Sequence, residues 1–441
     1  MNLNGIIGSL KSSRLARDSF WAVFGNGLGY GLLLLAGIVI ARFLGRDVYG
    51  EYGLVKTTMI YIAGFATLGL GISSTKYIAN ALHADRSHVR SLARDAVSIT
   101  LVFSTMLAAG LAAVANPLAA FLGESGLVGA FRALAVIIVF KALNTTQNGV
   151  LAGFGDFREI ARNSVASGAL MLVACVPLTY FFGLTGAFIS LAASQGCNAL
   201  LNYLSIRKRT ASLTDHQSGS HKRELIAFSF PIALQELNYT VCNWGGIMLL
   251  TKLSSVGQVG IYSATMQWNG IITFIPGLLS NVILSHLSGT AGDETAHTHT
   301  LRTMLGVNFL TTAIPLAAIY MLAGWIATFY GATFAEMKCV IQVMTTATVF
   351  TACASVLYSE LLSRGHNWLL LSVRIVQDIV ILGTACRLLR QGEDTNGMSG
   401  AMDYAVGYVT GSVAYFIILL GAVRLTDRKR KMLGQNLPVL E

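Results

Sequence analysis

Long uninterrupted apolar segments constrain this chain more than any other feature of its sequence. Each reaches or approaches the length of about 20 residues with which a helix crosses roughly 30 Å of hydrocarbon. We count twelve of them in the 441 residues: 19–42, 47–72, 95–121, 126–152, 165–182, 184–206, 225–252, 257–287, 302–329, 335–362, 368–390 and 399–425. The short connectors leave almost no room for a soluble domain. The sequence therefore predicts an all-α, polytopic membrane protein with 12 transmembrane helices.

The formal net charge of +10 is unevenly distributed along the chain. With a cytoplasmic N-terminus, 22 of the 31 Lys and Arg fall in cytoplasmic tails and connectors. This is the bias that the positive-inside rule describes, and it predicts that both termini lie in the cytoplasm. Charged residues make up only 12% of the chain, about half of their share in soluble domains. Topology explains the charge, so no nucleic-acid partner is expected.

Cysteine, histidine and the first apolar segment add further expectations. That segment is longer than the apolar core of a secretory signal and has no A-x-A cleavage site, so no cleaved signal peptide is expected. The six cysteines have no C-x-x-C spacing, and we interpret them as small buried hydrophobic residues rather than disulfides or metal ligands. The "HTH" at 297–299 has no neighbouring ligand residues, which predicts a solvent-exposed loop and no metal site.

A stretch of alternating glycines, "GNGLGYG" at 25–31, has a superficial likeness to a phosphate-binding loop. Such a loop needs a preceding strand and a soluble βαβ unit, whereas these glycines lie inside one apolar segment. On a helix, Gly25 and Gly29 share one face and Gly27 and Gly31 another, a spacing that lets a second helix approach closely. Glycine also makes a helix easy to bend. We predict helix packing, or bending, at these glycines and no nucleotide.

The two halves of the chain repeat at an offset of 210 residues. The matching positions are Ser19 and Ser229, Phe20 and Phe230, Gly50 and Gly260, Tyr52 and Tyr262, Leu151 and Leu361, and Gly155 and Gly365. Because an even number of spans separates the copies, we predict two six-helix lobes related by a parallel pseudo-two-fold repeat. The polar, basic segment 207–224 would be a cytoplasmic linker between an N-lobe, 1–206, and a C-lobe, 225–441, which ends in a basic tail.

Three stretches resemble one family of membrane proteins. They are "ARFLGRDVYGEYGLV" after the first span, "FATLGLGIS" at the end of the second and "FSFPIAL" at the start of the seventh. They look like the polysaccharide-unit (O-antigen or Wzx-like) flippases of the multidrug/oligosaccharidyl-lipid/polysaccharide (MOP) exporter superfamily, and the resemblance covers nearly the whole chain. It implies two six-helix lobes in a V shape around a central cavity with cationic and polar side chains.

The resemblance also implies a substrate, partners and a location. The substrate would be an undecaprenyl-diphosphate-linked oligosaccharide repeat unit, moved to the outer leaflet by alternating access for the synthesis of O-antigen, capsule or exopolysaccharide. The location would be the bacterial cytoplasmic (inner) membrane. The expected partners are this polyprenyl-linked oligosaccharide, the lipid bilayer and other polysaccharide-assembly proteins, and the protein is expected to be a monomer. No cofactor is expected, and coupling to H⁺ or to Na⁺ stays open.

Ionisable side chains within the spans are the candidate transport residues, because each costs about 2.5–3.5 kcal/mol to insert at mid-membrane. Lys56 in the second span, with Lys141 and Arg132 in the fourth, could bind a diphosphate through charge-assisted hydrogen bonds. Glu236 in the seventh span could exchange a proton or cation, or act as a counter-charge to Lys56. Its repeat partner is Asn26. The structural alternatives are snorkelling for Lys56 and a hydrogen bond within the bundle for Glu236.

Two further pairs of charged residues are interpreted as structural. Arg374 and Asp378 stand four residues apart in the eleventh span, a spacing that favours an ion pair on one helix face. Glu360, at the end of the tenth span, is expected to pair with Arg364 in the same way.

A sugar site needs amide groups and aromatic rings together, and two stretches supply both. "MQWNG" gives Gln267, Trp268 and Asn269 in the eighth span, and "VCNWGG" gives Asn243 and Trp244 in the seventh. Tryptophan at the membrane interface is the alternative explanation. The first, second, seventh and eighth spans line the gap between lobes in the implied fold, which favours the eighth-span residues.

Two other functions remain open beside the flippase. A cation-coupled multidrug exporter of the same fold would need acidic groups in its cavity, whereas the charges within these spans are mostly positive. A membrane glycan polymerase or ligase would need a long extracytoplasmic loop with reacting groups, and the longest candidate, 391–400, is too short. The protein is therefore expected not to be an enzyme.

Overall fold

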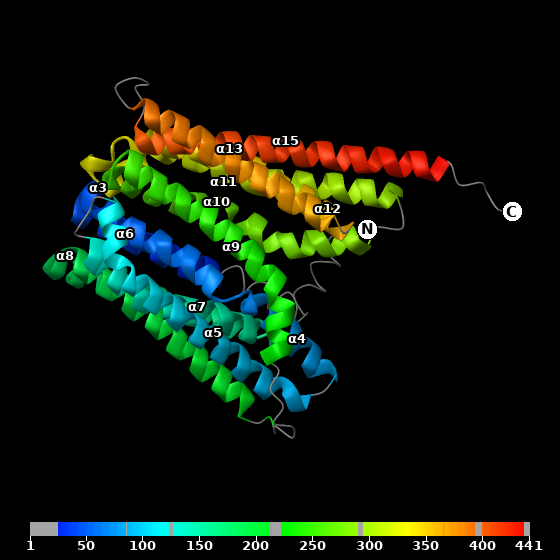
Figure 1. Ribbon diagram of the computed structural model, residues 1–441, viewed down its shortest axis with the longest axis horizontal. Helices are drawn as coiled ribbons and strands as arrows, with labels where there is room; N and C mark the ends of the chain where they lie inside the picture. The colour runs from blue at the N-terminus through cyan, green and yellow to red at the C-terminus, as the bar shows by residue number, and fades with distance from the viewer. Residues whose placement is uncertain are drawn as a thin grey trace, which may run out of the picture. The chain divides into compact units, whose positions relative to one another are not determined.

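The computed structural model describes residues 25–84, 86–122, 127–211, 213, 222–289, 294–364, 366–392 and 399–435 (Figure 1). Long helices make up almost all of this part of the chain. The predicted linker 207–224 and the start of the first predicted span lie partly outside the described residues, and so does the side chain of Asn26.

The helices form two compact units that meet in sequence at Lys252 and Leu253. The first unit contains α3 (Asn26–Ala66), α4 (Leu70–Ala84), α5 (Val89–Ala113), α6 (Ala115–Leu122), α7 (Leu127–Gly153), α8 (Phe157–Thr210) and α9 (Lys222–Leu253), with a 3₁₀ turn at Arg86–His88. The second contains α10 (Val256–Gly289), α11 (Glu294–Tyr330), α12 (Met337–Ser363), α13 (Asn367–Gln391) and α15 (Gly400–Gln435), with a 3₁₀ turn at Ala332–Phe334.

Within the described residues, eight helices are long and apolar enough to cross a membrane, namely α3, α5, α7, α8, α11, α12, α13 and α15. Two of them span two apolar segments of the sequence each: α8 contains 165–182 and 184–206, and α3 covers most of 19–42 and 47–72. The helices α9 and α10 coincide with the segments at 225–252 and 257–287. The prediction of an all-α, polytopic membrane protein is confirmed, and the count of twelve spans stays a prediction.

Glycines with positive φ break the two longest helices at the boundaries between apolar segments. The φ angle is 69° at Gly45 in α3 and 56° at Gly183 in α8. A residue with a Cβ is strained in this left-handed region, whereas glycine is not. The sequence "FLGRD" after the first segment and "FFGLT" after the fifth therefore form the kinks at which two helical segments join.

The first unit is held together by close helix contacts and one ion pair. α3 packs along α8, and α7 packs against α5, α4 and α8. Arg209, near the end of α8, donates two hydrogen bonds to the carboxylate of Asp156, which precedes the same helix. An apolar cluster lies nearby and includes Leu70, Val89 and Leu225 from α4, α5 and α9.

In the second unit, α12 is the central helix. It packs against α10, α11 and α15, and α13 packs along α15. An apolar cluster joins α12, α13 and α15 through Leu357, Leu361, Val373, Tyr415 and Leu419, all of them buried.

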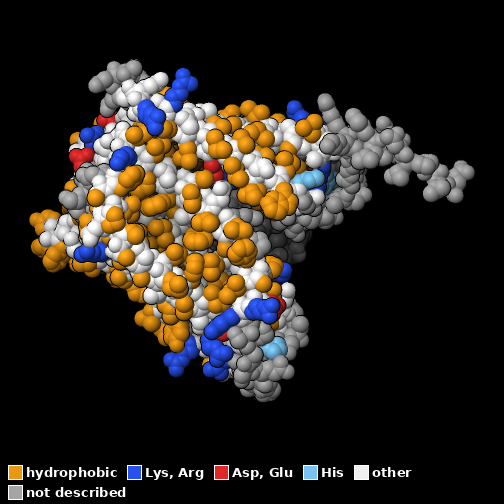
Figure 2. All heavy atoms as spheres, in the orientation of Figure 1, with side chains coloured by type: hydrophobic (Ala, Val, Ile, Leu, Met, Phe, Trp, Pro, Cys, Tyr) orange, Lys and Arg blue, Asp and Glu red, His pale blue; other side chains and the backbone are white. Residues whose placement is uncertain are grey.

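Large apolar side chains are exposed on the outer faces of the long helices. Phe181 is 74% exposed, Met321 84% and Trp325 72%. Figure 2 shows hydrophobic side chains spread over much of the described surface that it draws. Such surfaces are expected of helices that face lipid rather than water.

The contacts of α9 differ from those that the sequence repeat leads one to expect. By sequence, α9 begins the predicted C-lobe, 225–441, yet in the structure it groups with α3–α8 in the first unit. Ser229 of α9 hydrogen-bonds Ser73 of α4, and Thr240 donates to the carbonyl of Tyr61. The division into lobes at 207–224 stays a prediction about the repeat.

Candidate functional site

The three basic candidates of the first unit lie on α3 and α7, two helices that pack against each other. The Nζ atom of Lys56 lies 6.0 Å from the centre of the Tyr52 ring. Lys141 is half-buried on α7 and Arg132 is exposed on the same helix. Within the described residues, neither Lys141 nor Arg132 forms an ion pair. Lys141 thus presents a charge among apolar helices without an acidic neighbour.

Glu236 lies on α9 at the level of Gly64 on α3. A Cβ atom added to Gly64 would lie 3.4 Å from Oε2 of Glu236. The carboxylate is half-buried, and among the described residues it forms no hydrogen bond or ion pair. No ion pair therefore joins it to Lys56, which lies eight residues from Gly64 and so about 12 Å away along the helix.

Side-chain hydrogen bonds join α9 to other helices of the first unit at separate points along its length. Near the middle, Trp244 Nε1 donates to Thr58 Oγ1 at 3.2 Å. At one end, the hydroxyls of Ser73 and Ser229 are 2.6 Å apart. At the other, Lys252 Nζ donates to the carbonyl of Phe121 at 2.6 Å. The residue numbers on α9 rise as those on α3 and α4 fall, so the helices run antiparallel, and Glu236 lies between the contacts of Ser229 and Trp244.

Tyr77 of α4 lies near the end of the contact between α4 and α9, after the second predicted span, which ends at residue 72. Its ring meets the Phe228 ring edge-on, with 5.5 Å between centroids, and the Nζ of Lys76 lies 4.1 Å from the centre of the same Phe228 ring. Partial desolvation and, to a smaller extent, the Glu224 carboxylate raise the pKa of the Tyr77 phenol.

Amide side chains also connect the helices of the first unit, and the sequence reading did not identify them. Asn144 of α7 donates to the side-chain and backbone oxygens of Gln195 at 3.0 Å. Asn202 of α8 donates to Asn148 and accepts from Asn163. Polar groups buried in a membrane protein need such partners. These amides are uncharged, so they do not stand out among the ionisable residues of the spans. The signal that could have identified them is a polar amide within an apolar segment.

The candidate sugar-binding residues lie on α9 and α10. Gln267 and Asn269 are buried within the second unit, and Trp268 donates its indole N–H to the hydroxyl of Tyr330 at 3.2 Å. Asn243 donates to the carbonyl of Tyr239 in its own helix. Sugar contact by these residues stays a prediction.

The glycines of the opening stretch lie at the contact between α3 and α8. A Cβ atom on Gly25 would overlap Ala161, and one on Gly29 would lie 3.1 Å from the backbone of Ser164. Gly31 has nothing within 4 Å of such an atom. Close helix approach therefore occurs at Gly25 and Gly29, on one face of α3.

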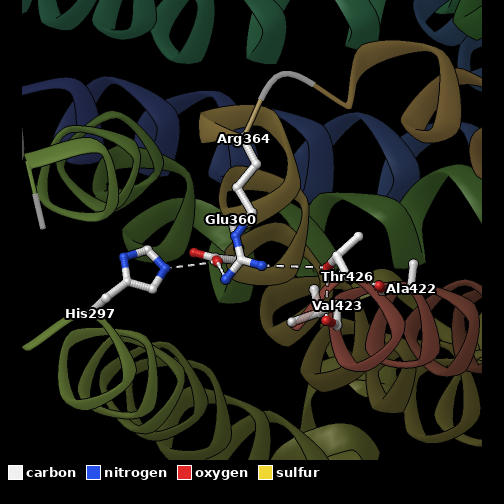
Figure 3. Close-up of polar contacts among 6 residues, drawn as sticks. All are labelled: His297, Glu360, Arg364, Ala422, Val423 and Thr426. Atoms are coloured by element: carbon white, nitrogen blue, oxygen red, sulfur yellow. Dashed lines mark hydrogen bonds and ion pairs between the residues drawn. The ribbon is translucent and has the colours of Figure 1, made fainter. Parts of the chain in front are cut away.

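The expected loop at 297–299 is wrong, because all three residues lie in α11, and the expected exposure to solvent is wrong for His297 alone. His297 lies in the first turns of α11, which begins at Glu294, and it is only 5% exposed. Its Nε2 atom is 2.7 Å from Oε1 of Glu360, and Arg364 pairs with the same oxygen (Figure 3). The predicted Glu360–Arg364 pair is thus present. The helix starts before its apolar segment does, which is why hydropathy placed His297 outside it.

The Arg374–Asp378 pair is also present, with 3.6 Å between Arg374 Nε and Asp378 Oδ2. Asp378 is buried, on the helix that packs along α15. Within the described residues, no group of three or more His, Cys, Asp and Glu side chains is arranged to hold a metal ion.

A sequence model of one protein family, described as "Polysaccharide biosynthesis protein", matches residues 39–312, more than half of the chain. The chain belongs to this family. Over 88% of its length it is 22% identical to the EPS I polysaccharide export inner membrane protein EpsE of Ralstonia solanacearum, of which the match covers 92%. Over 62% it is 21% identical to a putative O-antigen transporter of Shigella flexneri, of which the match covers 66%.

Solved structures show that this polysaccharide biosynthesis protein has the fold of the MOP superfamily. An inward-facing multidrug resistance transporter of the MATE family matches 91% of the chain and 96% of its own length, with a TM-score of 0.77 and 16% identity. A second MOP transporter, from Pyrococcus furiosus, matches 93% of the chain and 96% of its own length, with a TM-score of 0.64 and 16% identity. Its structure is described as having a binding pocket of reverse polarity that suggests a different function.

Proposed function

We propose that this protein is a flippase that carries polyprenyl-diphosphate-linked oligosaccharide units across the bacterial inner membrane. The match to the polysaccharide biosynthesis family carries the proposal. The names of two relatives, a polysaccharide export inner membrane protein and a putative O-antigen transporter, support export rather than an enzyme reaction. The superfamily fold supports transport across the membrane through helices alone.

The charges within the spans fit an anionic headgroup. A diphosphate carries negative charge that a bilayer excludes, so a protein path across the membrane needs positive groups. Lys141 is half-buried without an acidic partner in the described chain, and Lys56 lies on the neighbouring helix α3. In the proposed function these two lysines bind phosphate oxygens through charge-assisted hydrogen bonds.

Glu236 is the proposed coupling residue. A carboxylate that is half-buried against Gly64 and has no described hydrogen-bond or ion-pair partner is open to a proton or a cation. Binding either one would neutralise it and change its interaction with water and with α3. Proton and sodium gradients imposed separately distinguish H⁺ from Na⁺ as the coupling ion.

The proposed function is tested in a strain that lacks the protein. Polyprenyl-diphosphate oligosaccharides would be extracted and quantified by mass spectrometry, with surface glycan measured in the same cultures. We expect the lipid-linked unit to accumulate while surface glycan is lost, and the mass of the unit to identify its sugars. Unchanged levels of both would overturn the proposal.

A cation-coupled multidrug exporter is the second candidate, because the MATE transporters share the fold. Export of cationic drugs favours acidic groups in the path, whereas Lys56 and Lys141 are basic. The same strain distinguishes the candidates, since sensitivity to cationic drugs without accumulated lipid-linked oligosaccharide would favour the exporter.

A further inference from the structure

One apolar cluster brings the ends of three helices of the first unit together. Its buried members include Val89 and Leu92 at the start of α5, Ile206 near the end of α8 and Leu225 at the start of α9. Ile160, near the start of α8, belongs to the same cluster. The residues that adjoin these positions in the chain therefore lie around one region, at a single end of the first unit.

Exposed basic side chains surround this apolar cluster. They are Arg90 and Arg94 on α5, Arg162, Arg207 and Lys208 on α8, and Arg223 on α9, and we call these six residues the basic rim. Figure 2 shows Lys and Arg side chains gathered over this end of the first unit. No rim side chain forms an ion pair or a hydrogen bond with another described residue. The rim therefore presents its charge to the surroundings of the protein.

The acidic residues at these helix ends offset little of that charge. Within the described ranges 86–95, 156–162, 207–211 and 222–225 they are Asp95, Asp156, Glu159 and Glu224. Asp95 and Asp156 are buried, and Asp156 pairs with Arg209, which is not a rim residue. Glu159 is half-buried, so Glu224 alone of the four is exposed. The surface around the cluster is therefore positively charged on balance.

Exposed apolar side chains continue the basic faces of two of these helices into the predicted spans. On α5, Leu101 follows Arg94 by seven residues and is exposed. On α8, Leu204 precedes Lys208 by four residues and is exposed too. Residues four or seven apart lie on one face of a helix. Each of these two faces is therefore basic at its end and apolar beyond it.

An anionic phospholipid matches this combination of charges and apolar faces. Its headgroup places negative charge at the membrane surface, where Lys and Arg attract it, while its acyl chains lie deeper, among apolar side chains. The charge distribution along the chain predicts that this end of the first unit faces the cytoplasm. A soluble acidic protein would match the charges but would not need exposed apolar side chains below them.

We propose that the basic rim binds anionic phospholipids of the cytoplasmic leaflet, with their phosphates on the Arg and Lys side chains and their acyl chains along the exposed faces of α5 and α8. Because the rim extends over the ends of α5, α8 and α9, the bound lipid bridges helices that one apolar cluster holds together. This contact with the bilayer is independent of what the protein transports.

Selective retention of lipid tests the proposal on the unaltered protein. The purified full-length protein in detergent would be mixed with equal amounts of phosphatidylglycerol, which is anionic, and phosphatidylcholine, which is zwitterionic. Native mass spectrometry would then count the molecules of each lipid that stay bound. We expect phosphatidylglycerol to be retained in preference, and the preference to fall as the salt concentration rises, because salt screens exposed charges. Equal retention of the two lipids would overturn the proposal.

Two double variants with the same change of charge locate the binding surface. Arg207→Gln with Lys208→Gln removes two rim charges, and Arg387→Gln with Arg390→Gln removes two exposed charges from the end of α13. Each rim charge should raise the affinity for the headgroup about fivefold. The rim variant should therefore bind phosphatidylglycerol roughly 25-fold more weakly in a lipid titration, whereas the α13 variant should bind it like the wild type. An equal loss in both variants would overturn the proposal, because total charge rather than the rim would then retain the lipid.

Thermal stability in detergent provides a second measurement on the same proteins. Without added lipid, the rim variant should melt close to the wild type, because its substitutions lie on the exposed surface. Added phosphatidylglycerol should raise the melting temperature of the wild type and of the α13 variant more than that of the rim variant, since a ligand stabilises the state that binds it. The same rise in all three proteins would contradict lipid binding at the rim.

Discussion

The hydroxyl oxygens of Ser73 and Ser229 lie 2.6 Å apart, although 156 residues separate them in the chain. This hydrogen bond fixes the start of α9 on α4. On the same face of α9, Glu236 comes to lie beside Gly64, and Trp244 reaches Thr58. The carboxylate of Glu236 is therefore positioned by the contacts of α9 with α3 and α4.

The Ser73–Ser229 contact predicts an intramolecular cross-link. In the double variant Ser73→Cys and Ser229→Cys, the sulfur atoms should be within reach of a disulfide, which needs Cβ atoms about 3.5–4.5 Å apart. With a protease site inserted in 207–224, oxidised membranes should retain a full-length band on a non-reducing gel. Ser74→Cys with Ser229→Cys is the matched control, since Ser74 follows Ser73 and points elsewhere on the helix. Equal cross-linking of the two pairs would contradict this docking of α9.

The two lysines of α3 and α7 should matter for transport more than for folding. Lys56→Ala and Lys141→Ala should each lower transport by about tenfold or more, the size of one lost hydrogen bond to a charged group. Lys→Arg at the same positions should retain part of the activity because the charge remains. Transport would be measured as surface glycan per unit of membrane-inserted protein.

Lys338 provides the control for this pair of variants, because it is exposed at the start of α12. Lys338→Ala should leave surface glycan unchanged. Full activity in both Lys56→Ala and Lys141→Ala would refute the proposed role in diphosphate binding.

Glu236 should determine how transport depends on an ion gradient. Glu236→Gln keeps the size of the side chain and removes its charge, so transport in everted vesicles should no longer respond to a proton or sodium gradient. The assay would compare each gradient separately, which also identifies the ion. A gradient response equal to that of the wild type would show that coupling lies elsewhere.

The crossing of α4 and α7 should tolerate no side chain at Gly149. A Cβ atom there would overlap the carbonyl oxygen of Gly71, and Thr75 already donates to the carbonyl of Gly149 at 2.9 Å. Gly149→Val should destabilise the protein by about 1–3 kcal/mol, seen as a lower melting temperature in detergent and lower membrane abundance. Gly110→Val on α5, where nothing lies within 4 Å, is the control. Equal stability of the two variants would contradict the close packing.

Hydropathy determined the fold class, because a chain with so many long apolar segments can satisfy its backbone hydrogen bonds in lipid only as helices. It also located the breaks in α3 and α8, since Gly45 and Gly183 stand between apolar segments. The pairs Glu360–Arg364 and Arg374–Asp378 were also predictable from local sequence. Their spacing of four residues brings side chains together on any helix.

Contacts between distant segments could not be predicted in this way. Nothing local in "HTH" shows that His297 meets Glu360, because the contact depends on how α11 crosses α12. The same holds for Asn144 and Gln195, whose amides look like ordinary polar residues in apolar segments until α7 and α8 pack.

The sequence by itself determined that this chain is a helical membrane protein, where most of its spans lie and which charges they contain, since hydropathy and spacing act along the chain. Only the tertiary structure decided which helices are neighbours. It placed α9 on the first unit, Glu236 beside Gly64 and two basic side chains on one buried carboxylate. The reason is physical: side-chain partners across helices depend on packing at a few small residues, and that packing is a property of the whole bundle.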